Sequence, residues 1–219
     1  MDDALEAPAA PPDPRASDTL ARLAAGTLLL TGTAWLARAV WEIRLYSAGE
    51  PASGPPDQGG GTHRPLDSLE NAYHLVSAAG SLLTLLCAAA FLMWLWRVRD
   101  NALALSGRPP KYAGIWVYLG WVVPVVNLWF PRGIVADAYR ASAPGQRLPA
   151  VVNVWWVLWL AGAFGGVLQQ RSTDSVIARA YSDIGPLLTA DVAVAGAAVA
   201  GALMVRTVTA AQTARLARV

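Results

Sequence analysis

The feature that most constrains this chain is the separation of its charges from its apolar residues. Charged side chains lie at the ends of long apolar blocks rather than alternating with them, so the apolar surface is concentrated in stretches long enough to meet lipid. Of the 219 residues, 55% are hydrophobic and 15% are charged, whereas about 25% of an average soluble domain is charged. The sequence therefore predicts an all-α integral membrane protein and excludes a disordered or nucleic-acid-binding protein.

Four apolar blocks are long enough to cross a bilayer, and a fifth is not. A hydrocarbon core of about 30 Å needs about 20 helical residues. The fifth block, 115–130, is shorter than this, and Pro124 and Asn127 interrupt it before Pro131 stops it. It is predicted to be a re-entrant or interfacial segment. The predicted transmembrane helices are 20–41, 73–96, 151–168 and 184–205.

The basic residues predict the orientation, because cytoplasmic loops carry an excess of Lys and Arg. If block 115–130 does not cross, most of the 17 basic residues lie on the same side as both termini, whereas they are split about evenly if it crosses. We therefore expect four spans with both termini in the cytoplasm. Lys111 is the one lysine, and together with the abundance of alanine this indicates a GC-rich bacterial genome and hence the bacterial cytoplasmic membrane.

Outside the spans, the sequence predicts polar connections around a helical membrane domain at 20–210. Residues 1–19 are rich in Pro, Ala and acid and are expected to form a disordered cytoplasmic tail. The Gly- and Pro-rich stretch 46–69 is expected to be a flexible external loop, and 211–219 a cytoplasmic C-terminal tail. Residues 133–142 separate apolar from charged positions and predict a short interfacial helix.

Aromatic and small residues give expectations about packing. Cys87 lies in an apolar run and is expected to be a small buried side chain. Trp121 fits the core and the interface equally well. Glycines of the last two spans are expected to allow close helix packing; they are Gly162, Gly165, Gly166, Gly196 and Gly201. The tryptophans expected at the inner membrane interface are Trp94, Trp96, Trp116, Trp129, Trp155, Trp156 and Trp159.

No group of residues competent for catalysis stands out in the sequence. His63 and His74 are not placed for paired haem ligation within a bundle, and His74 with Glu70 would lack further metal ligands. The glycine run 59–61 lacks the following Lys and Ser/Thr of a phosphate-binding loop. We therefore predict no catalytic residue, no cofactor and no metal, and we expect that the chain is not an enzyme.

Polar residues within apolar blocks are the remaining candidates. Pro124 leaves a backbone carbonyl without its helical hydrogen bond, and Asn127 supplies an amide that can satisfy exposed backbone groups. We expect the two residues to shape the re-entrant segment; the alternative is that they form a ligand-binding point. Arg38 and Asp191 fall at similar depth, so we hypothesise that they pair, as a structural ion pair or as part of a proton or ion relay. The candidate polar positions are Pro124, Asn127, Pro131, Asp137, Arg140, Ser142, Arg38 and Asp191.

A longer pattern is spread over roughly residues 82–205. It consists of Trp94 to Ala102, then Trp121, Pro124, Asn127-Leu128-Trp129, Pro131, Asp137, Arg140, Ala141 and Ser142, followed by Trp155-Trp156 and Trp159. This pattern resembles the bacterial membrane-protein family catalogued as domain of unknown function 4328. The resemblance implies a multi-pass membrane protein but no activity, cofactor or catalytic residue.

Three functional hypotheses follow from the sequence. The first is a non-catalytic scaffold or partner-binding protein, whose partners are the lipid bilayer and another membrane protein or a second copy. The second is a small transporter or channel component that uses Pro124, Asn127 and Asp191 around a polar cavity. The third is an intramembrane enzyme. A wet cavity that joins Asn127 to Asp191 would favour transport, whereas a dry bundle with an exposed apolar seam would favour partner binding.

Overall fold

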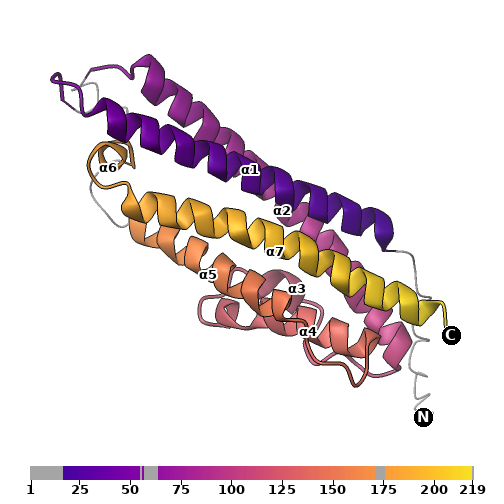
Figure 1. Cartoon of the computed structure of the whole chain (residues 1–219). Coiled ribbons are helices and arrows are strands. Elements are labelled where there is room, and N and C mark those ends of the chain that lie inside the picture. The colour runs from indigo at the N-terminus through magenta and orange to yellow at the C-terminus, as the bar shows by residue number, and fades with distance from the viewer. Residues whose placement is uncertain (1–16, 55, 57–63, 171–175, 219) are drawn as a thin grey trace, which may run out of the picture.

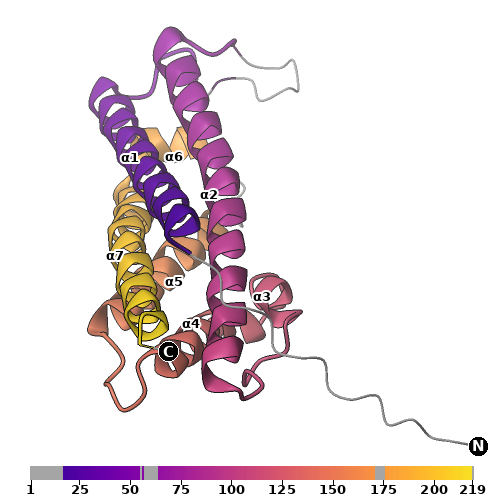
Figure 2. The same cartoon turned by 90° about the vertical axis from the view of Figure 1, so that its right-hand side faces the viewer.

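A computed structural model describes residues 17–54, 56, 64–170 and 176–218. Four long helices lie along one another in an elongated bundle (Figure 1). Shorter elements lie beside one end of the bundle, and α6 lies at the other end (Figure 2). The described part of the chain contains helices and no strand. The long helices are α1 (Asp18–Ala48), α2 (Ser68–Ser106), α5 (Ala150–Gln170) and α7 (Gly185–Leu216), and the short ones are α3 (Trp116–Leu119), the 3-10 helix η1 (Val126–Leu128), α4 (Phe130–Ser142) and α6 (Val176–Ser182).

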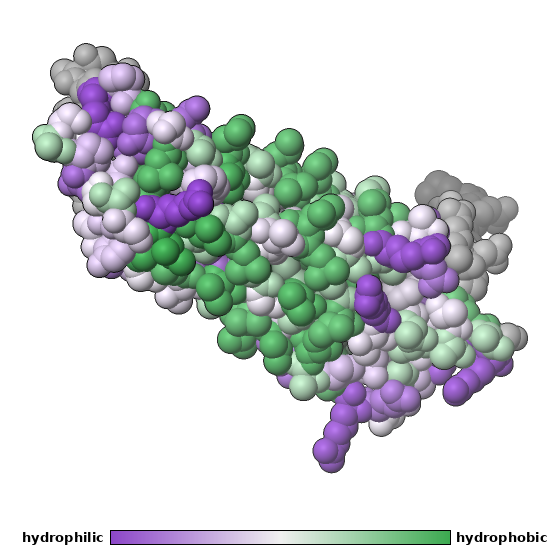
Figure 3. Space-filling model, turned by 45° about the horizontal axis from the view of Figure 1, so that its top comes forward, coloured by the Kyte–Doolittle hydropathy of each residue, from purple (hydrophilic) through white to green (hydrophobic). Residues whose placement is uncertain are grey.

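The surface and the helix lengths are those of a membrane protein. Three helices, α1, α2 and α7, are long and apolar enough to cross a bilayer, and α5 has a shorter apolar part at Ala150–Gly166. An apolar band surrounds the middle of the visible face, and polar residues lie at both ends (Figure 3). The start of α1 and the end of α7 lie at the same end of the bundle, beside α4 (Figure 1). The predicted helical membrane class is thus confirmed.

The helices continue beyond the predicted spans, because a helix does not have to end where the lipid ends. At the start of α2, the Asp67 side chain accepts from the Glu70 backbone and the Glu70 side chain accepts from the Asp67 backbone, a complete capping box. At its end, Gly107 adopts the left-handed conformation with φ of 61°. Helix α7 runs to Leu216, so the segment predicted as a C-terminal tail is mostly helical.

Small residues bring α7 close to its neighbours. A Cβ atom at Gly32 of α1 would lie 2.8 Å from the Ala198 Cβ, and one at Gly162 of α5 would lie 2.6 Å from the Val194 Cγ2. Such short distances mean that the helix backbones approach closely. The predicted role in close helix packing is confirmed for four of the five glycines, because a Cβ would lie within 3.1 Å of a neighbouring helix at Gly162, Gly165, Gly196 and Gly201. Gly166 is the exception, since a Cβ there would meet nothing within 4 Å. Cys87 is buried, as expected.

Several tryptophans fill the core instead of lying at the membrane interface. Trp94 is fully buried, and Trp155 and Trp156 are 2% and 4% exposed. The Trp94 indole donates a 3.0 Å hydrogen bond to the Thr209 hydroxyl of α7, which satisfies its polar atom inside the bundle. All three side chains fill the core between the helices. The prediction that the indole N–H faces the membrane surface is wrong for Trp94, because its acceptor comes from a neighbouring helix.

The block at 115–130 is broken, as predicted, into α3, a series of turns and η1. Val125 has a positive φ of 69°, which a β-branched residue rarely adopts, and this marks the sharpest bend. Contrary to the prediction, Pro131 does not stop a helix. It lies in the first turn of α4, where its missing N–H costs nothing. The short helix predicted at 133–142 is present as α4, with Ile134 and Ala138 buried and Arg140 exposed.

Two predicted polar segments fall partly outside the described residues. The expected N-terminal tail, 1–19, is described from residue 17, and α1 already begins at Asp18. The expected external loop, 46–69, is described except for 55 and 57–63; its ends are helical, since α1 runs to Ala48 and α2 begins at Ser68. Helix α6 was not predicted.

Candidate functional site

The ion pair hypothesised from the sequence joins α1 to α7. The Arg38 guanidinium donates to both carboxylate oxygens of Asp191, over 2.9 Å from Nε and 2.6 Å from Nη2. The Asp191 side chain is 1% exposed and that of Arg38 is 13% exposed. The guanidinium also lies 4.3 Å from the ring centroid of Trp35. The pairing is confirmed, and its bidentate geometry is the strongest that an Arg and a carboxylate can form.

Glu42 adds a second carboxylate to this pair. Its Oε1 atom lies 3.3 Å from Arg38 Nε and accepts a 3.2 Å hydrogen bond from the Tyr73 hydroxyl of α2. The Glu42 side chain is fully buried, and its Oε2 atom has no hydrogen-bond partner among the described residues. We call Arg38, Glu42, Tyr73 and Asp191 the Arg38 cluster. The spacing of four residues between Arg38 and Glu42 could have revealed the contact, but the predicted span ended at Trp41.

A second buried ion pair lies at the α6 end of the bundle. Arg64 donates to both oxygens of Glu70, over 2.6 and 2.8 Å, and the Tyr181 hydroxyl of α6 donates to Glu70 Oε1 over 2.9 Å. Burial, helped by the bond to Glu70, raises the pKa of Tyr181, so its hydroxyl stays a donor. This ion pair was not predicted from the sequence, although Asp67 and Glu70 have the spacing of a capping box. These contacts fix the end of the loop and α6 to the start of α2.

The candidate residues of the broken segment are held by aromatic packing. Pro124 is exposed, and Asn127 is half-buried with an Oδ1 atom that lacks a described hydrogen-bond partner. Trp121 packs edge-on against Trp159 with ring centroids 5.4 Å apart. The Trp156 indole donates over 3.0 Å to the backbone oxygen of Leu128, next to Asn127. The segment is therefore anchored to α5.

The remaining candidates lie on α4 and have mainly structural contacts. Pro131 is buried, Arg140 is exposed, and Asp137 accepts a 3.0 Å hydrogen bond from the Lys111 backbone. Ser142 is buried, donates to the Ala138 carbonyl over 2.8 Å, and its Oγ lies 3.5 Å from Gln212 Nε2. The structure does not bring Asn127 and Asp191 together. Asp191 pairs with Arg38 near the start of α7, whereas the Leu128 carbonyl beside Asn127 accepts from Trp156, whose neighbour Trp155 packs on Gly201, farther along α7.

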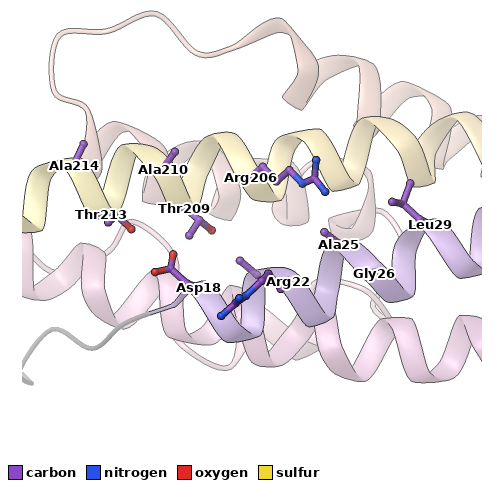
Figure 4. A pocket seen from close by; sticks show the side chains of 11 residues that line it. Asp18, Arg22, Ala25, Gly26, Leu29, Arg206, Thr209, Ala210, Thr213 and Ala214 are labelled. Carbon is purple, nitrogen blue, oxygen red and sulfur yellow. The ribbon is translucent and has the colours of Figure 1, made fainter.

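An open groove runs between α1 and α7 at the end where α1 begins. It encloses about 810 Å³. Its walls are mainly apolar or small, with Arg22 and Asp18 contributed by α1 and Arg206 by α7 (Figure 4). Both arginines are exposed, and neither forms an ion pair within the described residues. We call it the α1–α7 groove; its lining residues are Asp18, Ala21, Arg22, Ala25, Gly26, Leu29, Arg206, Thr209, Ala210, Thr213 and Ala214.

The described residues offer no ready site for a metal ion. No three His, Cys, Asp or Glu side chains in the described part of the chain gather closely enough to bind one. Glu42 and Asp191 approach the same guanidinium, but both oxygens of Asp191 are already occupied by Arg38. The polar groups of the Arg38 cluster therefore bond mainly to one another.

The fold is that of a helical membrane protein, because three of its helices are long and apolar enough to cross a bilayer. Residues 66–210 match the family model described as Domain of unknown function (DUF4328), and the chain belongs to this family. The matched region contains the predicted stretch 82–205, so the resemblance seen in the sequence is confirmed. No curated protein and no solved structure matches the chain. The match leaves out α1, which supplies Arg38, Glu42 and one wall of the groove.

Proposed function

We propose that this chain is a non-catalytic membrane protein that binds an anionic phospholipid in the α1–α7 groove. The observation that supports the proposal is the α1–α7 groove itself, which is mainly apolar and has one arginine on each wall. Acyl chains pack against apolar and small side chains, and a guanidinium binds a phosphate with two parallel hydrogen bonds. The chain is thus a partner-binding protein whose partner is a component of the bilayer.

The position of the two arginines supports a lipid headgroup as the ligand. Arg22 lies one turn into α1, and Arg206 lies in the second half of α7, where long basic side chains reach the membrane surface. With Asp18, the groove has two positive charges and one negative charge, which favours an anion. Farther along α1, Leu29 and Gly26 line an apolar path for an acyl chain.

The other two hypotheses have less support. A transporter site built on Asn127 and Asp191 would require both residues at one cavity, but Asp191 pairs with Arg38 near the start of α7, whereas the backbone beside Asn127 is bound by Trp156 of α5, near Gly201 of α7. An enzyme would need reactive groups open to a substrate, whereas Asp191 and Glu70 use both of their oxygens in ion pairs. We therefore propose neither activity.

Removal of the two groove arginines is expected to weaken lipid binding. In Arg22→Gln/Arg206→Gln, bound phosphatidylglycerol should fall by about tenfold or more, because charge-assisted hydrogen bonds to phosphate are lost. Native mass spectrometry of the full chain, released from bilayers of phosphatidylglycerol and phosphatidylcholine, measures the bound lipid. Arg108→Gln removes an exposed charge outside the groove and serves as the control. Equal lipid binding in the two variants would overturn the proposal.

Filling the groove is expected to have the same effect without any change of charge. A Cβ at Gly26 would meet nothing within 4 Å, so Gly26→Leu fits the fold and places its side chain in the groove. Bound phosphatidylglycerol should fall severalfold while the melting temperature is unchanged or higher, since Leu favours a helix more than Gly does. Unchanged lipid binding, or a dimer that Gly26→Leu dissociates while lipid remains bound, would contradict lipid as the occupant.

We also propose that the chain lies in the bacterial cytoplasmic membrane with both termini in the cytoplasm. The proposal is supported by the basic residues of the sequence and by the position of α4 at the end where α1 begins and α7 ends. A fusion of alkaline phosphatase after Arg140 should be inactive, and a cytoplasmic reporter at the same point should be active. Phosphatase activity there would contradict this orientation.

A further inference from the structure

The Arg38 cluster contains more negative than positive groups. Arg38 is one guanidinium, while Glu42 and Asp191 are two carboxylates in contact with it. All three side chains belong to helices that can span a bilayer, and none is more than 13% exposed. An unbalanced charge in such surroundings is costly, so groups of this kind pair or become neutral. One of the two carboxylates therefore needs a positive partner that the described residues do not supply.

The hydrogen bonds show which carboxylate is short of a partner. Asp191 receives two bonds from Arg38, one on each oxygen, as an ionised carboxylate does. Glu42 receives a longer contact of 3.3 Å from Arg38 and a bond from the Tyr73 hydroxyl, both on Oε1. Its Oε2 is buried and has no described partner. Oε2 of Glu42 is thus the open atom of the cluster.

A single open oxygen suits a proton better than a metal ion. Ca²⁺ and Mg²⁺ need about six oxygen ligands, and both Asp191 oxygens as well as Glu42 Oε1 already accept hydrogen bonds. A proton needs one oxygen. The titratable groups beside Glu42 are Arg38 on the same helix, Tyr73 from α2 and Asp191 from α7, which shares the Arg38 guanidinium. Helix α6 also packs on α1 and carries Arg179 and Tyr181, and the Tyr181 hydroxyl donates to Glu70.

We propose that Glu42 is a proton-binding site of this membrane bundle, a neutral carboxylic acid with its hydrogen on Oε2 while Arg38 pairs with Asp191. Arg38 Nε lies within 3.3 Å of both acids, so a small shift of its guanidinium toward Glu42 favours release of that proton and leaves Asp191 without its partner. The contact between α1 and α7 is thereby linked to the binding of one proton. The site is independent of the lipid groove.

Infrared spectroscopy tests this proposal directly. The full chain in bilayers of an ether-linked phosphatidylcholine, which has no ester carbonyl, should show at neutral pH the carbonyl stretch of a protonated carboxylic acid. Labelling of glutamate alone with ¹³C should shift the band, which assigns it to glutamate even if a variant fails to fold. Absence of the band in the wild-type chain, or a band that glutamate labelling does not move, would overturn the proposal.

Three variants identify the residue that carries the proton. Glu42→Gln should abolish the band and leave the melting temperature within a few degrees, because the amide resembles a neutral acid in shape. The exposed Glu50→Gln should leave the band unchanged. Asp191→Asn should also remove the band, since Arg38 then turns to Glu42, which ionises. A band that persists in Glu42→Gln would overturn the assignment. The infrared results do not depend on lipid binding in the α1–α7 groove. The lipid proposal and the Glu42 proposal can therefore be disproved independently of each other.

Discussion

Arg38→Met is expected to destabilise the bundle by about 3–5 kcal/mol, because it leaves the buried Asp191 carboxylate without its positive partner. It also removes the guanidinium from the Trp35 ring. Thermal unfolding of the purified chain, followed by circular dichroism, measures the loss. Arg44→Met is the matched control, because Arg44 is exposed on the same helix and its guanidinium also stacks on a tryptophan, Trp41.

The double variant Arg38→Met/Asp191→Leu distinguishes two causes of the lost stability, the uncompensated charge of Asp191 and the loss of side-chain packing. Replacing a buried ion pair by apolar side chains of similar volume is often neutral or stabilising. We therefore expect the double variant to recover most of the stability that Arg38→Met loses. If Arg38→Met melts at the same temperature as Arg44→Met, the ion pair does not hold α1 to α7.

Gly162→Leu is expected to cost about 3 kcal/mol or more, and expression should fall with stability. Even a Cβ at this position would lie 2.6 Å from the Val194 Cγ2 and 3.3 Å from the Val194 backbone nitrogen. A β-branched side chain and a backbone atom cannot move aside separately, so α5 and α7 must separate. The measurement is the unfolding temperature of the purified chain.

Gly166→Leu provides the control, one turn farther along the same helix. A Cβ there would meet nothing within 4 Å. Both substitutions gain the same helix propensity of about 1 kcal/mol relative to glycine, so their difference reports the contact with α7 alone. Equal stability of the two variants would show that α5 and α7 do not approach as closely as the structure indicates.

The sequence predicted the Arg38–Asp191 pair but not the full cluster, and the reason is physical. Depth in the membrane can be estimated from residue number, because each helical residue advances by about 1.5 Å. Arg38 and Asp191 could therefore be placed at one level. Glu42 was missed because the hydropathy of the sequence falls at Trp41, whereas the helix continues to Ala48. The hydropathy of a sequence indicates which residues lie in the bilayer, whereas the backbone hydrogen bonds determine where a helix ends.

The tryptophans and α6 could not be placed correctly from the sequence. A Trp near the end of an apolar block has the same pattern whether it faces the membrane surface or a neighbouring helix. Trp94 is buried because its hydrogen-bond acceptor, Thr209, comes from α7, and no local pattern reveals such a distant contact. Helix α6 has seven residues, and its Tyr181 is fixed by Glu70 of α2, so tertiary contacts determine its position.

The place of α7 in the bundle has a consequence for biosynthesis. This helix contacts α1 through Gly32 and α5 through Gly162, yet a ribosome makes it after both. Arg38 therefore enters the membrane well before Asp191 is translated. During that interval the guanidinium depends on Glu42, on lipid phosphates or on the insertion machinery for its negative partner. The bundle can therefore close only after α7 has been made and has packed against both α1 and α5.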